Sequence, residues 1–305
     1  MAKNMYQKRE ERKNKPEEKV TTTNINWYPG HMVKTINELK GMSKLIDIVI
    51  EVLDARVCIS SRNLVVDEIF NNKPKIVVLN KSDLSDITDI SVYKKYFNTE
   101  HVILVNSSDK KDITKLITEI KRIGNSLDKY KNKDIEINNI IRVAIFGIPN
   151  VGKSTIINKL SNKQRVIVGN KPGVTKANKW IRIDNNIELL DTPGLLWPRL
   201  NENDVGIKLA LTGNIKQDIL DVYDLSLKGI DYLINNLKYK DMLINKYKLG
   251  NIDELKNYEI LELIGRKRGC IISGSEVDLN RTSCLFLDEI KNGKIGKFNL
   301  DENLD

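Results

Sequence analysis

The fold is decided by the stretch Gly147-Ile148-Pro149-Asn150-Val151-Gly152-Lys153-Ser154, which matches the phosphate-binding pattern G-x-x-x-x-G-K-[ST]. An apolar run over residues 140–146 precedes it and predicts a buried parallel strand, and residues 154–160 predict the start of a helix. Backbone N–H groups of such a loop and the N-terminus of the following helix favour a bound phosphate. The sequence therefore predicts a P-loop, with nucleotide contacts from Pro149, Asn150, Val151, Gly152, Lys153, Ser154 and Thr155. In it, Lys153 reaches the β- and γ-phosphates and Ser154 ligates Mg²⁺.

The length and charge of the chain set the context for this loop. A chain of 305 residues is expected to form two domains and can bury a sizeable core. The formal net charge of +9 favours a polyanionic partner such as a nucleic acid, although frequent surface lysines are an alternative explanation. The three cysteines are odd in number and scattered, which indicates a reducing compartment and no zinc site.

The N-terminal region predicts no targeting segment. No apolar run reaches membrane-spanning length, and four glutamates within residues 10–18 argue against a transit peptide. Residues 1–22 are polar and basic and predict a mobile arm, which either touches RNA or is merely a solvated tail. We expect a cytoplasmic protein with no membrane partner.

The remaining pattern predicts an α/β domain followed by a helical one. Apolar runs predict strands at 46–53, 75–79 and 102–105, and a hairpin of 179–183 with 187–190. Helices are expected at 33–45 and 114–127. From about residue 205 the pattern is helical, and Ile230, Leu233, Ile234 and Leu237 are spaced as one helix face. Further helices are predicted near 240–247, 258–264 and 276–290. We expect domains at 23–204 and 205–305.

Three further motifs distinguish among P-loop proteins. Asp191-Thr192-Pro193-Gly194 matches D-x-x-G at the end of a strand, where the Asp191 carboxylate holds Mg²⁺ through water and the Gly194 N–H senses the γ-phosphate. Thr175 lies in the loop after the P-loop helix, where a switch threonine would complete the Mg²⁺ shell.

The third motif specifies guanine. Asn80-Lys81-Ser82-Asp83 matches N-K-x-D, in which Asp83 accepts from the guanine ring N–H and exocyclic amine, a pairing that adenine cannot offer. Asn80 and Lys81 would brace the loop and the base. Alone, this motif could be only a polar turn between strands, but the set together predicts binding of GTP and GDP.

The order of these motifs is permuted. N-K-x-D follows D-x-x-G in the common arrangement of GTPases, whereas here Asn80 precedes the P-loop. Parallel strands can be reconnected while each motif stays at the carboxyl end of its strand, where ligands bind. The sequence thus predicts a circularly permuted P-loop GTPase domain, a mostly parallel sheet with helices on both faces, followed by an all-helical C-terminal domain. The D-x-x-G segment then leads directly into the helical domain.

The chain resembles the circularly permuted GTPases of the ribosome biogenesis GTPase A (YlqF-like) group. The resemblance rests on WYPGHM at 27–32, DARVCISSRN at 54–63, LNKSD at 79–83, GIPNVGKST at 147–155, PGVT at 172–175, DTPG at 191–194, LALTGNIK at 209–216 and IGRKRGCIISG at 264–274. It implies assembly of the large (50S) ribosomal subunit, with GTP hydrolysis stimulated by that subunit, and contacts to its rRNA and ribosomal proteins. We expect a monomer.

The same resemblance assigns a third nucleotide-binding loop. Asn106-Ser107-Ser108 stands where many GTPases carry Ser-Ala-Lys, and the contact there is largely through the backbone. Position is therefore a better guide than residue type for this loop.

The group that activates the attacking water is not obvious from the motifs. Many GTPases place Gln directly after D-x-x-G, but Leu195 and Leu196 follow it here and cannot hydrogen-bond a water. The resemblance nominates His31, on a turn after Trp27, Tyr28 and a Pro-Gly pair; the alternative is a surface histidine on an anchoring turn. In related GTPases an asparagine at the position of Asn150 ligates K⁺, whereas the alternative is a residue that braces the loop.

Basic residues in the second domain predict a surface for RNA. Arg266, Lys267, Arg268 and Arg281 would contact phosphates without reading sequence, unless they are simply a solvated helix face. Three other functions stay open: a GTP sensor without turnover, a GTPase of mitochondrial ribosomes, and an RNA-binding scaffold with a vestigial pocket.

Overall fold

The computed structural model describes residues 30–127, 140–161, 179–192, 204–215 and 221–301. The predicted arm, the turn at 27–29, Thr175 and Gly194 lie outside these ranges. The chain forms two compact units, one of residues 26–200 with 301–305 and the other of residues 201–300 with 1–25. No helix in the described part of the chain is long and apolar enough to cross a membrane.

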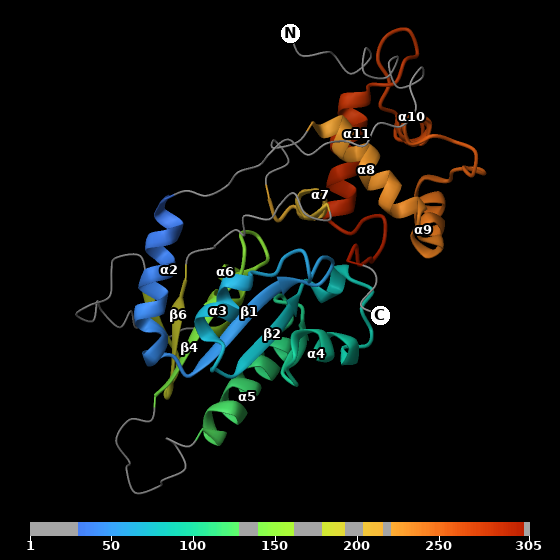
Figure 1. Cartoon of the computed structure of the whole chain (residues 1–305). Helices are drawn as coiled ribbons and strands as arrows, with labels where there is room; N and C mark the ends of the chain where they lie inside the picture. The colour runs from blue at the N-terminus through green and yellow to red at the C-terminus, as the bar shows by residue number, and fades with distance from the viewer. Residues whose placement is uncertain (1–29, 128–139, 162–178, 193–203, 216–220, 302–305) are drawn as a thin grey trace, which may run out of the picture. The chain divides into compact units, whose positions relative to one another are not determined.

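The first unit is built on a six-stranded sheet in the order β3-β2-β1-β4-β6-β5 (Figure 1). Every pairing is parallel except that of β5 with β6, which is the predicted hairpin. The strands are β1 (Ile48–Asp54), β2 (Lys75–Asn80), β3 (Val102–Val105), β4 (Ile141–Phe146), β5 (Lys179–Asp184) and β6 (Ile187–Asp191). All seven residues of β1 are buried, as expected for a central parallel strand covered on both faces.

The strand register places the predicted motifs along one edge of the sheet. Asp54 at the end of β1 pairs with Asn80 at the end of β2, and Asn80 pairs with Val105 at the end of β3. On the other side, Ile145 near the end of β4 pairs with Asp191 at the end of β6. Loops that are remote in sequence therefore leave the sheet next to one another, at the carboxyl ends where ligands bind in this class of fold.

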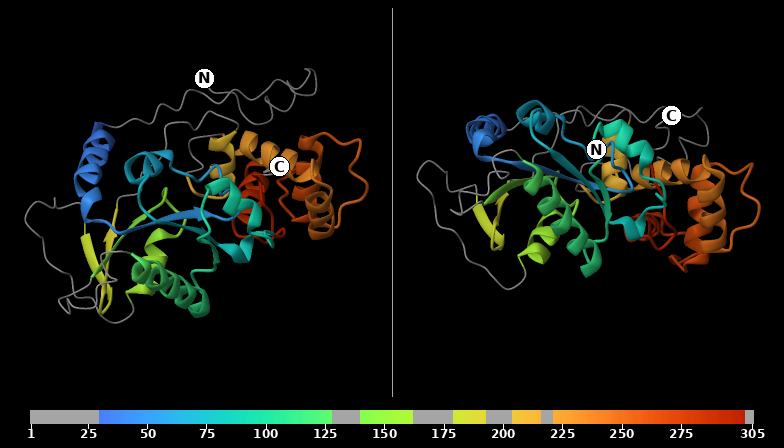
Figure 2. Two further views of the ribbon diagram at one scale, coloured as in Figure 1. Left: turned by 60° about the horizontal axis from the view of Figure 1, so that its bottom comes forward. Right: turned by 90° about the horizontal axis from the view of Figure 1, so that it is seen from below.

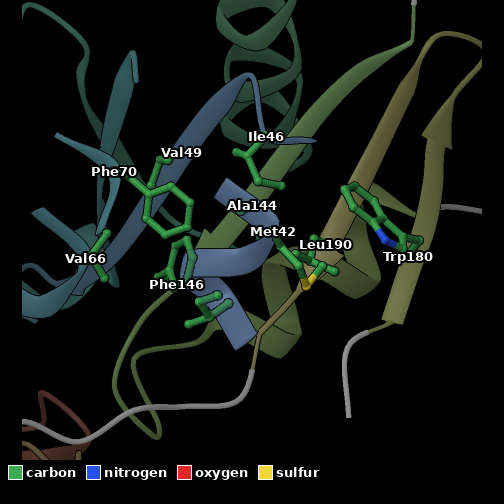
Figure 3. Close-up of a cluster of buried hydrophobic side chains, with 10 residues drawn as sticks. Met42, Ile46, Val49, Val66, Phe70, Ala144, Phe146, Trp180 and Leu190 are labelled. Carbon is green, nitrogen blue, oxygen red and sulfur yellow. The ribbon is translucent and has the colours of Figure 1, made fainter. Parts of the chain in front are cut away.

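One face of the sheet is covered by α2 (Gly30–Met42) and α3 (Leu64–Phe70). Their apolar side chains form a buried cluster with side chains of β1, β4, β5 and β6, which Figure 3 shows in close-up. The ring centroids of Phe70 and Phe146 lie 5.1 Å apart and the rings are tilted, at a distance that is typical of paired aromatic side chains. Trp180 of the hairpin closes the cluster at the far end.

A second cluster on this face lies under α4 (Ser91–Phe97), where Tyr93 and Phe97 pack against β1, β2 and β3. The opposite face carries α5 (Lys110–Ser126) and α6 (Lys153–Leu160), which pack against each other (Figure 2). Short 3-10 turns occupy 43–45 and 82–84. Helices thus cover both faces, as the sequence predicts.

Several helix boundaries differ from those predicted. The sequence predicts neither α3 nor α4, because each spans only seven residues and too few turns to show a periodic pattern. Helix α5 begins at Lys110 rather than near residue 114, since the Asp109 side chain caps it by accepting from the Lys111 N–H at 2.8 Å. Helix α2 begins at Gly30, three residues earlier than expected.

The second unit is helical, with α7 (Val205–Leu211), α8 (Val222–Ile234), α9 (Leu237–Tyr247), α10 (Asn257–Lys267) and α11 (Leu279–Lys291). Helix α8 packs on α9, α10 and α11. At Gly229 of α8, an added Cβ would lie 3.0 Å from side-chain atoms of both Leu211 and Ile290, so the small residue permits close helix packing. Helix α11 begins at Leu279, later than the predicted residue 276, because Asp278 caps it.

The prediction that Leu237 continues the apolar face of α8 was wrong. Ile230 and Leu233 are buried, but α8 ends at Ile234 and the Leu237 side chain is 80% exposed. The Asn236 side chain accepts a hydrogen bond from the Tyr239 N–H at 3.3 Å and so begins a separate helix. A capping residue thus interrupts a spacing that otherwise looks continuous.

Candidate nucleotide-binding site

The P-loop connects β4 to α6, in the strand–loop–helix context that the sequence predicts. Two of its glycines stand where an added side chain would meet a neighbouring strand. A Cβ on Gly147 would lie 2.8 Å from the Val52 carbonyl oxygen, and one on Gly152, whose φ is +96°, would lie 2.1 Å from Asn80 Nδ2. The loop is therefore pressed against the ends of β1 and β2. Pro149, Asn150, Ser154 and Thr155 are exposed, whereas Val151 is fully buried.

Asn80 joins three loops by one buried side-chain amide. Its Nδ2 donates to the Val151 carbonyl of the P-loop at 2.7 Å, and its Oδ1 accepts from the Ser107 N–H at 3.2 Å. A planar amide that donates on one side and accepts on the other is suited to such bridging. The predicted phosphate, base and third loops are thereby held in one arrangement.

The other residues of N-K-x-D are accessible to a ligand. Asp83 is exposed on the 3-10 turn after β2, as a base acceptor must be. Lys81 has a left-handed backbone, with φ 59° and ψ 37°, and its ammonium donates to Asp54 Oδ2 at 2.8 Å.

The third loop is stabilised by the chain around it. The Asn106 N–H donates to Asp112 of α5 at 2.9 Å, and the Ser108 N–H donates to the Asn106 side-chain oxygen, also at 2.9 Å. Asn106 thus stabilises its own loop through its side chain, so residue type contributes here as well as position. The backbone contact of this loop with the nucleotide stays a prediction.

The phosphate-binding lysine and the D-x-x-G aspartate are in direct contact. Lys153 forms an ion pair with Asp191 at the end of β6. The next residue, Thr192, donates its hydroxyl to the Ile145 carbonyl of β4 at 2.7 Å and so ties the end of β6 to the P-loop strand. The Asp191 carboxylate and the exposed Ser154 hydroxyl are hard oxygen donors, which Mg²⁺ prefers. The residues present therefore fit a Mg²⁺–phosphate group at this position.

Sequence reasoning missed a buried pair beside this site. Asp54 and Arg56 are almost fully buried, and the Arg56 Nε and Nη2 donate to the two Asp54 oxygens at 3.0 and 2.8 Å. Burial alone would raise the pKa of the Asp54 carboxyl, but Arg56 and then Lys81 lower this pKa to about 2. The sequence does carry a signal of this pair: an acid and an arginine two residues apart directly after a buried strand.

The predicted catalytic residues are only partly placed. His31 lies in the first turn of α2 rather than on an open turn before the helix. Thr175 and Gly194 lie outside the described residues. The other histidine, His101, stands at the amino end of β3, remote from the P-loop edge, and its Nδ1 lies 2.7 Å from Glu119 Oε1.

The predicted RNA-binding residues lie at the end of α10 and the start of α11 in the helical unit. All four are exposed, but two have structural partners. Arg266 donates to the Ser275 carbonyl at 3.2 Å, and Arg268 pairs with buried Glu289 at 2.8 Å. Glu289 also accepts from the Tyr247 hydroxyl at 2.5 Å, so Arg268 helps to neutralise a buried carboxylate.

Comparison with known proteins places this geometry among GTPases. A family model described as 50S ribosome-binding GTPase matches residues 142–259. The match starts in β4 and includes the P-loop, whereas residues 80–83 precede it, in keeping with the permuted order. Ribosome biogenesis GTPase A of Priestia megaterium is 40% identical over 281 residues, covering 91% of this chain and 96% of that protein.

A more distant relative and a solved structure are also similar over most of the chain. Mitochondrial GTPase 1 of Schizosaccharomyces pombe is 32% identical, covering 90% of this chain and 89% of that protein. The crystal structure of GNP-bound YlqF from T. maritima superposes with a TM-score of 0.58 at 25% identity, covering 88% of this chain and 100% of that one.

Proposed function

Because this chain belongs to the ribosome biogenesis GTPase A family and hydrolyses GTP, we propose that it drives a late step in assembly of the large (50S) ribosomal subunit. In this proposal the subunit stimulates hydrolysis, and its rRNA and ribosomal proteins are the partners. The ribosomal part of the proposal rests on the family to which the chain belongs. The observation that carries its GTPase part is the Asn80 amide, which joins the base-specificity loop to the P-loop as a shared guanine nucleotide site requires.

Each motif residue has a distinct role at this site. Lys153 binds the β- and γ-phosphates, and Asp83 accepts from the guanine N–H groups. Ser154, Asp191 and Thr175 would hold Mg²⁺, which supplies charge neutralisation at the phosphates when bound. The Gly194 N–H responds to the γ-phosphate. Because Lys153 and Asp191 form an ion pair, phosphate and Mg²⁺ would engage two groups that already lie together.

The water is activated by a group outside D-x-x-G. The side chains of Leu195 and Leu196 offer no hydrogen-bonding group, so His31 is assigned to orient the attacking water once the ribosomal particle is bound. Asn150 would hold K⁺, which would supply positive charge beside the phosphates. Asn150 is exposed on the P-loop with φ 61°, a backbone state that asparagine tolerates, so its structural and ligand roles are separable by substitution.

Contacts to rRNA are assigned mainly to Lys267 and Arg281. Arg266 and Lys267 in the last turn of α10 suit the helix dipole, but Arg281 in the first turn of α11 opposes it. A cation beside the positive end of a helix dipole would favour a bound phosphate. Arg266 and Arg268 contribute charge to the same surface while they hold structural contacts.

The decisive experiment is a GTPase assay with and without purified large ribosomal subunits. We expect the subunits to raise the turnover of GTP, and small subunits at equal concentration to leave it unchanged. A GTP sensor would bind nucleotide without turnover even with large subunits. A scaffold would bind rRNA equally with GTP, with GDP or with neither.

The mitochondrial alternative is favoured by one observation, the 32% identity to Mitochondrial GTPase 1 of Schizosaccharomyces pombe. Bacterial and mitochondrial large subunits should therefore be compared in the same assay. Stronger stimulation by the mitochondrial particle would reverse the proposed setting.

A further inference from the structure

The lysine of N-K-x-D is tied to a buried acid–base pair that the nucleotide motifs do not include. The Asp54 carboxylate accepts from Arg56 through Nε at 3.0 Å, Nη2 at 2.8 Å and the backbone N–H at 3.1 Å. Its Oδ2 also accepts from Lys81 Nζ at 2.8 Å. Asp54 and Arg56 are at most 1% exposed, whereas the Lys81 side chain is 22% exposed and can be reached from solvent.

Stability alone is a poor explanation for this arrangement. A buried ion pair loses much of its attraction to desolvation, and apolar side chains of similar volume often stabilise a fold as well or better. Here the charges of Asp54 and Arg56 are buried where β1 and β2 end. Asp54 also pairs with the ammonium of Lys81, which belongs to the base-specificity motif. The geometry points to a role in placing Lys81.

The backbone of Lys81 supports this interpretation. Its φ of 59° and ψ of 37° lie in the left-handed region. Lysine rarely adopts this conformation unless the surrounding structure holds it there. Several contacts hold this position. Asp54 holds the side chain, and the Asn80 carbonyl, one residue earlier, accepts from the Ala55 N–H at 2.8 Å. The Lys81 carbonyl accepts from the Leu84 N–H at 2.9 Å. The loop after β1 therefore holds N-K-x-D by both backbone and side chain.

We propose that Asp54, clamped by Arg56, is a positioning residue that fixes the Lys81 side chain as one wall of the guanine site and so sets affinity for guanine nucleotides. This inference rests on the assignment of Asn80–Asp83 to the base. A lysine has an apolar stem and a charged head. With the head held by Asp54, the stem is ordered before the base binds, which lowers the entropic cost of binding.

A double-mutant cycle on the full chain tests the inference. Affinity for a fluorescent GDP analogue is measured with Mg²⁺ for the unmodified protein, Asp54→Asn, Lys81→Met and the double variant. We expect each single substitution to weaken binding by about tenfold, as loss of a charge-assisted hydrogen bond would. Because Asp54 acts through Lys81, the double variant should bind about as weakly as either single one. If the two single effects multiply instead, Asp54 acts independently of Lys81 and the inference is overturned; unchanged affinity in Asp54→Asn also overturns it.

Two controls separate this outcome from others. Asp47→Asn removes another buried carboxylate, which accepts from the Arg142 N–H at 2.9 Å just before β1, and should lower stability without changing affinity for the GDP analogue. Asp83→Asn should shift preference from guanine toward xanthine nucleotides. If it does not, the assignment of Asn80–Asp83 fails; if it does and the cycle is multiplicative, only the role of Asp54 fails.

Asp54→Asn leaves the Arg56 guanidinium buried without its charged partner, which can prevent folding. In that case the cycle is run from Asp54→Asn combined with Arg56→Gln, which removes both charges while keeping polar side chains at both positions. Lys81→Met in that background should cause no further loss of affinity. A further loss of about tenfold would show that Lys81 works without the pair, and would overturn the inference.

Discussion

The side-chain amide of Asn80 donates to the carbonyl of Val151 at 2.7 Å, across 71 residues of sequence. Val151 belongs to the P-loop and Asn80 to the base-specificity loop, so one hydrogen bond connects the two halves of the nucleotide site. In this permuted chain the loops follow different strands, β4 and β2, which are separated in the sheet by β1. Because β2 and β4 do not pair directly, this hydrogen bond fixes the two loops relative to each other in a way that strand pairing alone does not.

Substituting Asn80 should affect the site and the stability together. Asn80→Ala leaves the Val151 carbonyl and the Ser107 N–H without their partner, and each unsatisfied group costs about 1–3 kcal/mol. We expect the unfolding free energy to fall by about 2 kcal/mol. We expect the affinity for GTP and the affinity for GDP to fall by the same factor as each other, because both nucleotides contain the base and the β-phosphate. Asn158→Ala, exposed on α6, is the matched control; it should leave nucleotide affinity unchanged and raise stability by less than about 1 kcal/mol through helix propensity. A selective loss of GTP affinity would contradict the bridging role.

Strand ends are more predictable from the sequence than residues that act across elements. The apolar runs that lead to Asn80 and Gly147 are long and buried, and such runs by themselves assign both motifs to the carboxyl edge of a parallel sheet. The ion pair of Asp54 with Lys81 is not predictable in this way. It depends on strand register and on a left-handed backbone, and no local pattern encodes either.

The residues that follow the helical unit, from Asp301 on, belong again to the unit that contains the sheet. Asp301 is buried against the loop after β1, where it accepts from the N–H groups of Ile59 and Ser60, both at 2.8 Å, and from the Ser60 hydroxyl at 2.5 Å. This tertiary contact spans more than 240 residues, and an aspartate in a polar C-terminal stretch gives no sequence signal of it. Only the folded chain brings these groups together.

Loss of the Asp301 carboxylate should destabilise the unit that contains the sheet. Asp301→Ala leaves two backbone donors unsatisfied in a buried loop, and we expect a loss of about 2 kcal/mol of unfolding free energy. Tryptophan fluorescence in urea measures this unit selectively, because all three tryptophans fall within residues 26–200. Glu100→Ala breaks an exposed ion pair with Lys94 and should cost less than about 1 kcal/mol. Equal effects of the two substitutions would contradict a stabilising role for Asp301.

Acid should weaken the same unit through Asp54. Its pKa is lowered from 3.8 to about 2 in the folded chain, so its contribution is fully present above pH 4 and is lost as the pH falls toward 2. The shift corresponds to about 2 kcal/mol. Arg122 lowers the pKa of Glu119 to about 2 as well, so the total acid slope is not specific to Asp54. The difference in unfolding free energy between the unmodified protein and Asp54→Asn should be constant from pH 5 to 7 and should shrink below pH 4. If this difference stays constant down to pH 2, Asp54 is not the titrating group.

A monovalent cation at Asn150 should be visible in the kinetics. We expect GTP hydrolysis to be faster in K⁺ than in Na⁺ at equal ionic strength, by about tenfold if the cation lowers the barrier by about 1.4 kcal/mol. Asn150→Gly keeps the left-handed backbone accessible and removes only the amide, so it should abolish the difference while nucleotide affinity persists. Equal rates in both salts for the unmodified protein would remove the cation site.

The last prediction concerns the attacking water and His31. The chain has two histidines, and His101 lies at the amino end of β3 beside Glu119, away from the P-loop edge. His31 lies in the first turn of α2, so any approach to the γ-phosphate involves the start of this helix. With large subunits present, His31→Ala should retain its affinity for GTP and lose two to three orders of magnitude in turnover, about 3–4 kcal/mol for one positioned group. The variant should then persist on the particle as a stalled GTP complex. His101→Ala is the matched control and should keep the stimulated rate. If His31→Ala hydrolyses GTP at the normal stimulated rate, the water is activated by another residue or by the ribosome itself.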